Sequence, residues 1–471
     1  MKVLMLMPPF LMKERYGKGF EKIGSVLPPL GLLYLGAVLE KAGHKPEILD
    51  TQFYEWAPKK TAEECAKYDA DVIGIYCNTS NYAHAVRLAD ELKELNDVPI
   101  VFGGPHVTTR PMEVLKNKSV DYVVFGEGEY SFLELVNHLS KRKGASISRI
   151  KGIGYKDSSG RPRLNAPRSL IKNLDELPFP ARHLVDMGRY RPSPNQYKRL
   201  PTATMIASRG CPYNCKFCDV ERLWGRAYRA RSVENVIQEI KALVRDYGIR
   251  DINFWDDLWG LNKEWVHGFC KAVEREKLDI TWCCECRVNT INPETLRMMK
   301  KAGCWAIFFG VESLDQGILD AVSKHTSVKM IEDALRWTKA AGIEIRANFI
   351  LALPEETPGK VKCMLDKLCR LNPDYVKFNI LTPYPDTVLY DEIKAGKWGR
   401  LVSEDYDKLT GYFATFVPHG YRDAAQVEAV RRYAYRRYYF RAGYIFSRLR
   451  SVRNTEDIRR LVRGVVAIAN L

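Results

Sequence analysis

The feature that most constrains the fold of this 471-residue chain is a regular alternation of short apolar runs with longer amphipathic stretches. Five apolar runs in the first block predict buried strands: KVLML (2–6), KPEIL (45–49), DVIGIY (71–76), PIVF (99–102) and DYVVF (121–125). The intervening stretches predict helices over 30–42, 61–68, 82–96, 110–117 and 129–142. This pattern predicts an α/β domain over residues 1–142, built on a doubly wound parallel sheet.

Ligands of such sheets bind beyond the carboxyl ends of the strands. Three of these ends contain small or glycine-rich segments that let a bulky ligand approach the backbone closely. These segments are Asn78-Thr79-Ser80, Gly103-Gly104-Pro105-His106 and Gly126-Glu127-Gly128-Glu129. We expect a ligand site at this edge of the sheet.

A second block of alternation runs through residues 201–392. Six strand-like runs occur there, in order TATMIAS, INFWDD, ITWCCEC, WAIFFG, IRANFIL and YVKFNI. Helix starts at Ser232, Asn262 and Asn292 support the count. Six such units predict a partial (β/α)6 barrel with reactive groups at the carboxyl ends of its strands. Residues 143–200, which are rich in Gly, Pro and Arg, are expected to form a connector, and residues 393–471 a helical, basic C-terminal region.

Three cysteines follow the first strand of the predicted barrel. Cys211, Cys215 and Cys218 lie in SRGCPYNCKFCDV with a C-x3-C-x2-C spacing. Closely spaced thiolates can converge on one metal centre, and three ligands leave one iron of a [4Fe–4S] cluster open. A structural zinc site or unrelated buried thiols are the alternatives, although the loop has no histidine that could complete a zinc site. The chain's twelve cysteines and the lack of an export signal favour thiols or metal ligands over disulfides.

This loop resembles the signature of radical S-adenosylmethionine (SAM) enzymes, including an aromatic residue, Phe217, before the third cysteine. The resemblance covers about 202–390, because FWDD (254–257), CRVNT (286–290), GVES (310–313), NFILALPEET (348–357) and TPYPDTVLY (382–390) follow in the family's order. It implies that SAM binds near Phe217, Asp256, Asp257, Arg287, Glu312 and Ser313. Ala352, Glu355 and Asp386 replace glycines that are common in the family.

Each of these SAM residues also has an ordinary structural interpretation. Glu312 and Arg287 could form an ion pair within the barrel, and Asp256 and Asp257 could cap a helix. The segment CCEC (283–286) raises the alternative of a second cluster. Strand alternation places Cys284 and Cys286 on the face opposite Cys283, which makes a shared metal unfavourable.

The first block resembles the cobalamin-binding domain of B12-dependent radical SAM enzymes. PPLGLLYLGAVLEKAGH (28–44), GGPHVT (103–108) and FGEGE (125–129) carry this resemblance. It implies that cobalamin is bound by Thr79, Ser80, Gly103, Gly104, His106, Gly126, Glu127 and Gly128. The D-x-H-x-x-G motif that supplies a cobalt-ligating histidine is absent, so we expect no histidine on cobalt; His106 could also be an ordinary capping or surface residue. A tRNA methylthiotransferase would carry three cluster cysteines here, whereas this block has only Cys65 and Cys77.

The net charge of +16 favours an anionic partner, and half of it lies between Arg422 and Arg463. The segment RRYAYRRYYFRAGYIFSRLR (431–450) interleaves arginine with aromatic residues on a predicted helix. It could bind nucleic acid, lie on an anionic membrane surface, or pack its aromatics on the barrel. Nucleic acid is the least favoured partner. We expect a cytoplasmic protein, with peripheral membrane contact left open, since no run of about 18 apolar residues and no signal peptide occurs.

The combined resemblance implies a cobalamin-dependent radical SAM methyltransferase that uses a [4Fe–4S] cluster, SAM and a one-electron reductant of the flavodoxin or ferredoxin type. A 5'-deoxyadenosyl radical would open an unactivated carbon of a hydrophobic, lipid- or tetrapyrrole-like small molecule to methylation. A radical SAM cyclase or another enzyme that forms C–C or C–O bonds is the alternative within the class. A non-catalytic iron–sulfur protein that binds nucleic acid or senses redox state is the alternative from another class.

Overall fold

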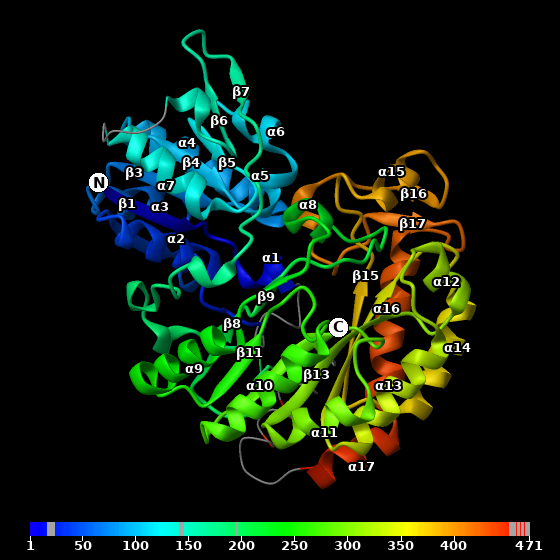
Figure 1. The fold of residues 1–471 in the computed structure, drawn as a ribbon. Coiled ribbons are helices and arrows are strands. Elements are labelled where there is room, and N and C mark those ends of the chain that lie inside the picture. The colour runs from blue at the N-terminus through cyan, green and yellow to red at the C-terminus, as the bar shows by residue number, and fades with distance from the viewer. Residues whose placement is uncertain are drawn as a thin grey trace. The chain divides into compact units, whose positions relative to one another are not determined.

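The computed structural model describes residues 1–16, 24–140, 146–193 and 196–451, together with positions 458, 462 and 466. The chain divides into two compact units. The first contains Met1–Arg15, Val26–Arg191 and Arg222–Gly225, and the second contains Tyr16–Ser25, Pro192–Glu221 and Arg226–Leu471. Figure 1 shows the fold of each unit, with the first in blue to cyan and most of the second in green to red.

The first unit is built on a seven-stranded sheet in the order β2-β1-β3-β4-β5-β6-β7. Strands β1 to β5 run parallel, which confirms the predicted doubly wound sheet. The strands are β1 (Lys2–Met7), β2 (Lys45–Asp50), β3 (Val72–Tyr76), β4 (Ile100–Gly103), β5 (Tyr122–Val124), β6 (Ile153–Lys156) and β7 (Pro162–Leu164). The last two are antiparallel and come from the expected connector. They escaped prediction because they have only four and three residues, too few to show an apolar alternation.

Helices cover both faces of this sheet. Helices α2 and α7 pack on one face through Leu32, Leu39 and Leu135, and α3 and α4 pack on the other through Ala62 and Leu88. The bounds are α1 (Met12–Tyr16), α2 (Leu30–Lys41), α3 (Pro58–Ala66), α4 (Tyr82–Leu95), α5 (Pro105–Thr109), α6 (Pro111–Leu115) and α7 (Gly128–Leu139). The helix expected over 110–117 begins at Pro111, because proline suits a first helical turn and restricts the residue before it. The final two residues of the helix predicted over 129–142 lie outside the described residues.

The second unit contains the predicted partial barrel, a six-stranded parallel sheet in the order β15-β14-β13-β12-β11-β8. Its strands are β8 (Thr202–Met205), β11 (Asp251–Phe254), β12 (Thr281–Cys286), β13 (Cys304–Glu312), β14 (Glu344–Leu351) and β15 (Tyr375–Ile380). The helices between them are α9 (Val233–Tyr247), α10 (Lys263–Arg275), α11 (Pro293–Lys301), α12 (Gln316–Ala321), α13 (Val328–Ala340) and α14 (Pro358–Leu371). Shorter elements are β9 (Ser208–Arg209), β10 (Arg229–Ala230), α8 (Val220–Trp224) and α15 (Val388–Lys394).

The helix starts expected from the sequence are present in the barrel. The side chains of Ser232, Asn262 and Asn292 accept hydrogen bonds from backbone N–H groups three residues ahead. Strand alternation sends Phe254 and Trp282 into the core beneath the helices, where both are fully buried. The opposite side of the sheet is called the inward face below. It carries the polar side chains of the barrel.

The C-terminal region becomes helical only at Ala424. The pair β16 (Gly399–Leu401) and β17 (Phe416–Pro418) precedes α16 (Ala424–Tyr439) and α17 (Ala442–Ser451). The aromatic side chains of α16 cover the free edge of β15: Tyr439 Oη bonds the backbone N and O of Val376 at 2.8 and 2.7 Å, and Tyr435 Oη accepts from Phe378 N at 3.1 Å. This part of the basic segment therefore packs on the barrel. Four further arginines of the basic C-terminal region, Arg453, Arg459, Arg460 and Arg463, lie outside the described residues.

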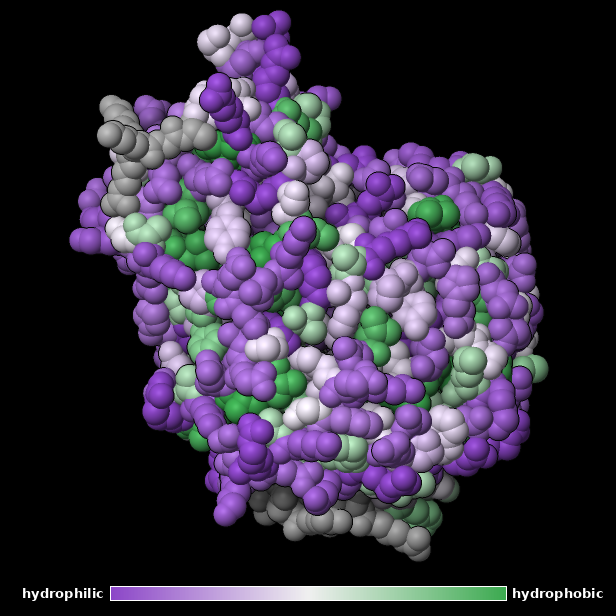
Figure 2. Space-filling model, viewed as in Figure 1, coloured by the Kyte–Doolittle hydropathy of each residue, from purple (hydrophilic) through white to green (hydrophobic). Residues whose placement is uncertain are grey.

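In the described part of the chain, no helix is both long and apolar enough to cross a membrane. Figure 2 shows that hydrophilic residues occupy most of the face in view, with hydrophobic residues scattered among them.

Candidate functional site

The cysteine loop lies at the carboxyl end of the first barrel strand. Gly210 turns the chain into the loop with φ +86°, and the N–H of Cys218 bonds the carbonyl of Cys215 at 3.0 Å. Backbone bonds on both sides of Lys216 tie the loop to Val322 (3.0 Å) and Leu389 (2.9 Å). The loop is therefore held by the ends of other barrel units rather than by its own contacts alone.

The three thiols of the loop lie near one another. Burial raises the pKa of Cys218 to about 12, and the charges of Cys215 and Cys211 act in the same direction. In the described part of the chain, no three His, Cys, Asp or Glu side chains are arranged to hold a single metal ion, and this includes the cysteine loop. Three thiolates can bind three different irons of a [4Fe–4S] cluster and leave the fourth iron open, whereas a closed zinc site needs four protein ligands.

Arg287 connects the loop to the third strand. Its Nη1 donates to Cys215 Sγ at 3.4 Å, and its guanidinium lies 3.7 Å from the ring centroid of Tyr213. Tyr213 is held in turn by Asn289, whose Nδ2 donates to the Tyr213 hydroxyl at 2.9 Å. These contacts fix the position of the Cys215 sulfur relative to the third barrel strand.

Lys324 joins Arg287 to Glu312, and sequence reasoning missed it. Arg287 Nη2 donates to the Lys324 carbonyl, and Lys324 Nζ lies 2.7 Å from Glu312 Oε1. Both members of this ion pair are buried, and the ammonium is 5.9 Å from the ring centroid of Phe217. Lys324 reaches this position through positive-φ residues on either side, Ser323 and His325, which no sequence periodicity reveals. Arg287 and Glu312 thus meet through Lys324, and not in the direct ion pair that was the structural alternative for these two residues.

Asp256 and Asp257 hold the backbone that leads into the cysteine loop. Asp256 accepts from Ala207 N (2.9 Å) and Ser208 Oγ (2.6 Å), while Asp257 accepts from Gly210 N at 2.9 Å. Burial raises the pKa of Asp256 to about 7. Its carboxyl group is committed to these protein partners. The helix-cap interpretation of this pair does not apply, because the partners lie in β9 and in the residues directly before and after it.

Three departures from the family pattern keep a glycine-like backbone. Ala352, Glu355 and Asp386 have φ values of +62°, +64° and +68°. Glu312 has φ +64° at a register shift between β13 and β14, and Ser313 beside it is buried. Non-glycine residues in this region cluster at functional sites.

The cysteines of CCEC lie on two faces, as expected. Cys284 and Cys286 have Sγ atoms 3.7 Å apart in the core beneath the helices, whereas Cys283 packs with Trp305 on the inward face. Cys304 is a further hydrogen-bonding neighbour of Cys284, and among the described residues no three His, Cys, Asp or Glu side chains are arranged to hold a single metal ion.

The expected cobalamin residues of the first unit come together at one sheet edge. Strands β3, β4 and β5 are neighbours, so Thr79 and Ser80, Gly103 and Gly104, and Gly126 to Gly128 follow adjacent carboxyl ends. Gly104 (φ +118°) passes so close to Cys77 that a Cβ would lie 2.6 Å from its carbonyl oxygen. At Gly126 (φ +76°) a Cβ would meet nothing within 4 Å. This open, side-chain-free backbone fits a large flat ligand.

His106 lies beneath this edge and is 1% exposed. Its Nδ1 is 3.3 Å from Thr79 Oγ1, and its ring centroid is 4.4 Å from that of Tyr82. Burial lowers the pKa of His106 to about 4, so the ring is neutral at pH 7. His106 is therefore packed as a buried residue that supports the sheet edge, and not as a side chain that extends toward a ligand.

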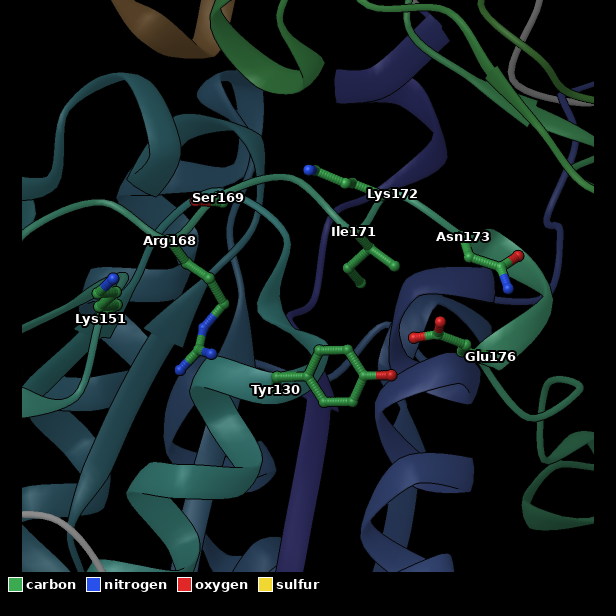
Figure 3. A pocket seen from close by; sticks show the side chains of 8 residues that line it. All are labelled: Tyr130, Lys151, Arg168, Ser169, Ile171, Lys172, Asn173 and Glu176. Carbon is green, nitrogen blue, oxygen red and sulfur yellow. The ribbon is translucent and has the colours of Figure 1, made fainter.

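Glu127 is anchored within the protein. Its Oε2 accepts from Ile171 N at 2.6 Å and thereby ties residues 168–176 to the glycine edge. A cavity of about 270 Å³ lies beside this contact, with Tyr130 of α7 and Arg168 and Lys172 of the connecting segment in its wall (Figure 3). Ligand pockets usually have about 300–1,000 Å³. The cavity is too small to hold cobalamin, and we assign no cofactor to it.

Comparison with known proteins agrees with this geometry. Residues 19–136 match the B12 binding domain family, and residues 205–368 match the Radical SAM superfamily. The chain is 36% identical over 393 residues to "Uncharacterized methyltransferase PH0819" of Pyrococcus horikoshii, covering 83% of each chain. It is 28% identical over 400 residues to the anaerobic magnesium-protoporphyrin IX monomethyl ester cyclase of Rubrivivax gelatinosus, covering 83% of this chain and 70% of the cyclase. The fold matches that of the radical SAM methyltransferase TsrM from Kitasatospora setae, with a TM-score of 0.67, 21% identity, and 84% of this chain and 78% of TsrM covered.

Proposed function

The chain belongs to the family of radical SAM enzymes that carry a B12-binding domain, and from this premise we propose that it methylates an unactivated carbon of a hydrophobic, lipid- or tetrapyrrole-like substrate. The family's cofactors are a [4Fe–4S] cluster, SAM and cobalamin. The proposal rests on two features that occur together in this chain. The first is the series of contacts that runs from Cys215 through Arg287 and Lys324 to Glu312. The second is the glycine edge of the first unit. The methyltransferase relative at 36% identity supports methylation over other outcomes.

Each expected site residue has a role in this proposal. Cys211, Cys215 and Cys218 would hold the cluster, with Arg287 donating to the Cys215 sulfur. Phe217, Asp257, Arg287, Glu312 and Ser313 would contact SAM, while Asp256 positions the loop through Ala207 and Ser208. Thr79, Ser80, Gly103, Gly104, Gly126 and Gly128 would form the cobalamin surface, supported from beneath by His106 and Glu127. When bound, the cluster and SAM supply a 5'-deoxyadenosyl radical, and cobalamin supplies a carrier for the methyl group.

Family membership and the relatives reduce the number of alternative functions that the sequence left open. Family membership makes the chain an enzyme, so the non-catalytic nucleic-acid-binding or redox-sensing alternative is set aside. The cyclase alternative keeps one specific support, the Rubrivivax gelatinosus relative. A one-electron reductant is needed by the family's chemistry, and we propose one of the flavodoxin or ferredoxin type. Tyr435 and Tyr439 of α16 bond the edge of β15, whereas Phe440, Phe446 and Leu449 of the same basic segment are exposed. Peripheral membrane contact stays a prediction.

The first experiment separates methylation from cyclisation by product mass. The protein is purified anaerobically, reconstituted with iron, sulfide and hydroxocobalamin, and incubated with SAM, dithionite and hydrophobic candidate substrates. Methylation adds about 14 mass units per transfer, whereas ring closure removes hydrogen. A label that passes from deuterated methyl-SAM into product supports methyl transfer. A product that has lost hydrogen and carries no label assigns the cyclase reaction instead.

The cluster assignment has a matched control within the chain. Cys215→Ala should lose both bound iron and the cleavage of SAM to 5'-deoxyadenosine, because it removes a ligand and the partner of Arg287. Cys363→Ala, at an exposed position of α14, should retain both. Retention of SAM cleavage in Cys215→Ala contradicts the assignment.

The cobalamin assignment also has a matched control. Gly126→Leu places a bulky side chain into open space at the glycine edge, and should lower cobalamin content after reconstitution by about tenfold or more. Gly160→Leu lies in the β6–β7 turn at a similar φ of +73°, also with nothing within 4 Å of its Cβ. It therefore controls for backbone strain. Equal cobalamin content in the two variants contradicts the proposed surface.

A further inference from the structure

Lys377 stands out on the inward face of the barrel. It occupies the middle of β15, where Val376 and Phe378 on either side are buried beneath the helices, so alternation places Lys377 on the opposite face. The side chain is exposed, and it forms no hydrogen bond or ion pair with any residue that the structure describes. The proposed roles above make no use of this ammonium.

A second cation lies one diagonal step away on the neighbouring strand. Asn348 pairs with Lys377 and Arg346 pairs with Tyr375, so Arg346 shares the inward face with Lys377 at a Cα separation of about 8 Å. Arg346 is only 4% exposed, and its guanidinium lies 4.9 Å from the ring centroid of Trp305 and 4.4 Å from that of Tyr375. Its Nη2 pairs with Glu344 at 3.1 Å, whereas its Nε and Nη1 have no partner among the described residues. Two cations on one face, only one of them paired, favour an anion beside them.

Glu285 of β12 does not neutralise Lys377. No ion pair joins the two side chains within the described structure. Burial raises the pKa of Glu285 to about 7, although the charge of Lys377 favours the ionised carboxylate. A carboxyl group of this kind is partly protonated at neutral pH and leaves the ammonium available to a ligand.

Apolar surface accompanies this charge. Trp255 directly follows β11, and the alternation from buried Phe254 places it on the inward side with 40% of its surface exposed. Phe308 of β13 lies on the same face, with its ring centroid 5.4 Å from the Arg346 guanidinium. An apolar wall with few polar groups is typical of a site that orients a small molecule.

We propose that Lys377 binds an anionic group, a carboxylate or a phosphate, on an otherwise apolar substrate, and that Arg346 reinforces this site electrostatically. This rests on the proposed function, because it identifies the substrate class of the same barrel. The Lys377 ammonium donates to the anionic oxygens while the apolar part of the substrate contacts Trp255 and Phe308. The anionic group thus fixes which substrate carbon faces the strand ends. Charge-assisted hydrogen bonds of this kind are the strong ones in binding sites.

The test measures binding of defined probes by titration calorimetry to the reconstituted holoenzyme. Decanoate and decyl phosphate carry the two anions, and decanamide is the neutral probe of similar length. Lys377→Met keeps the length of the side chain and removes the charge, and should weaken at least one anion by about tenfold or more without changing decanamide. Lys362→Met, an exposed lysine of α14, is the matched control and should bind all three probes as the wild type does. The anion that is weakened more identifies the carboxylate or the phosphate class.

Several outcomes overturn the proposal. They are equal anion affinity in Lys377→Met and the wild type, an equal loss for decanamide, and no anion binding by the wild type at millimolar probe. Iron content measured on each preparation shows that Lys377→Met has folded. SAM cleavage by the wild type is measured in parallel. Absence of SAM cleavage contradicts the proposed function. The Lys377 proposal is judged separately, from the binding of the anionic probes.

Discussion

The tyrosine hydroxyls that cover the edge of β15 lead to a quantitative prediction. Tyr435→Phe leaves the N–H of fully buried Phe378 without its acceptor at 3.1 Å, while the Phe378 carbonyl keeps Arg431 Nε at 3.1 Å. An unsatisfied buried donor costs about 1–3 kcal/mol. Tyr439→Phe removes the partner of both backbone groups of buried Val376, at a side chain that is itself only half-buried. We expect a loss of about 2 kcal/mol in the free energy of unfolding for Tyr435→Phe and about 1–2 kcal/mol for Tyr439→Phe.

Hydrogen exchange of the peptide covering residues 375–380 locates the effect. The amides of Val376 and Phe378 should exchange at least tenfold faster in the respective variants, and urea denaturation should report the accompanying loss of stability. Tyr433→Phe is the matched control, since Tyr433 lies on the same helix, is 42% exposed, and forms no hydrogen bond with a described residue. If both variants stay within 0.5 kcal/mol of the control (about the scatter of surface substitutions) and exchange is unchanged, the edge-cover reasoning is wrong.

Two further predictions concern buried charge. Burial raises the pKa of Glu356 to about 7 from 4.5, so the folded state binds a proton more tightly than the unfolded state does. The contribution of protonated Glu356 to stability is full below pH 4.5 and disappears as the pH rises through 7. The stability of the wild type relative to Glu356→Gln, which keeps acceptors for Ala352 N and Tyr421 Oη, should therefore fall by about 3 kcal/mol across this window, and a pH-independent difference in urea denaturation refutes it. Lys324→Met leaves Glu312 buried and unpaired and should cost about 3–5 kcal/mol, whereas adding Glu312→Gln should recover part of it; a double variant no more stable than the single one contradicts a direct coupling.

The parts of the fold that follow a hydrophobic period could be predicted from the sequence. All eleven predicted strands are present in the two sheets, because parallel strands buried on both faces leave short apolar runs. The strands β6 and β7 could not be predicted, since four and three residues are too few to show an apolar period. The β16–β17 pair was missed because each of its strands has only three residues, and the helical region begins later than expected.

The site was predictable where a motif fixes it and obscure where contacts span the chain. The cysteine spacing located the loop, and Arg287 does contact Cys215. Lys324 and the loop-holding role of Asp256 depend on partners from other strands and turns, which a linear pattern does not encode. The aromatic segment 431–450 looked suited to a membrane or nucleic acid, because tyrosines that satisfy a strand edge have the same composition as tyrosines that face a ligand.

The left-handed backbone at Ala352, Glu355 and Asp386 has a consequence for engineering this protein. Each residue holds a conformation that costs an L-amino acid about 1 kcal/mol and costs glycine little. Glycine would therefore relieve backbone strain at these three positions, all of which lie in loops that follow barrel strands. Glu355→Gly, at an exposed position, is the natural first step toward a more heat-resistant variant for anaerobic biochemistry, because Ala352 is fully buried and Ala352→Gly would also lose a packed methyl group.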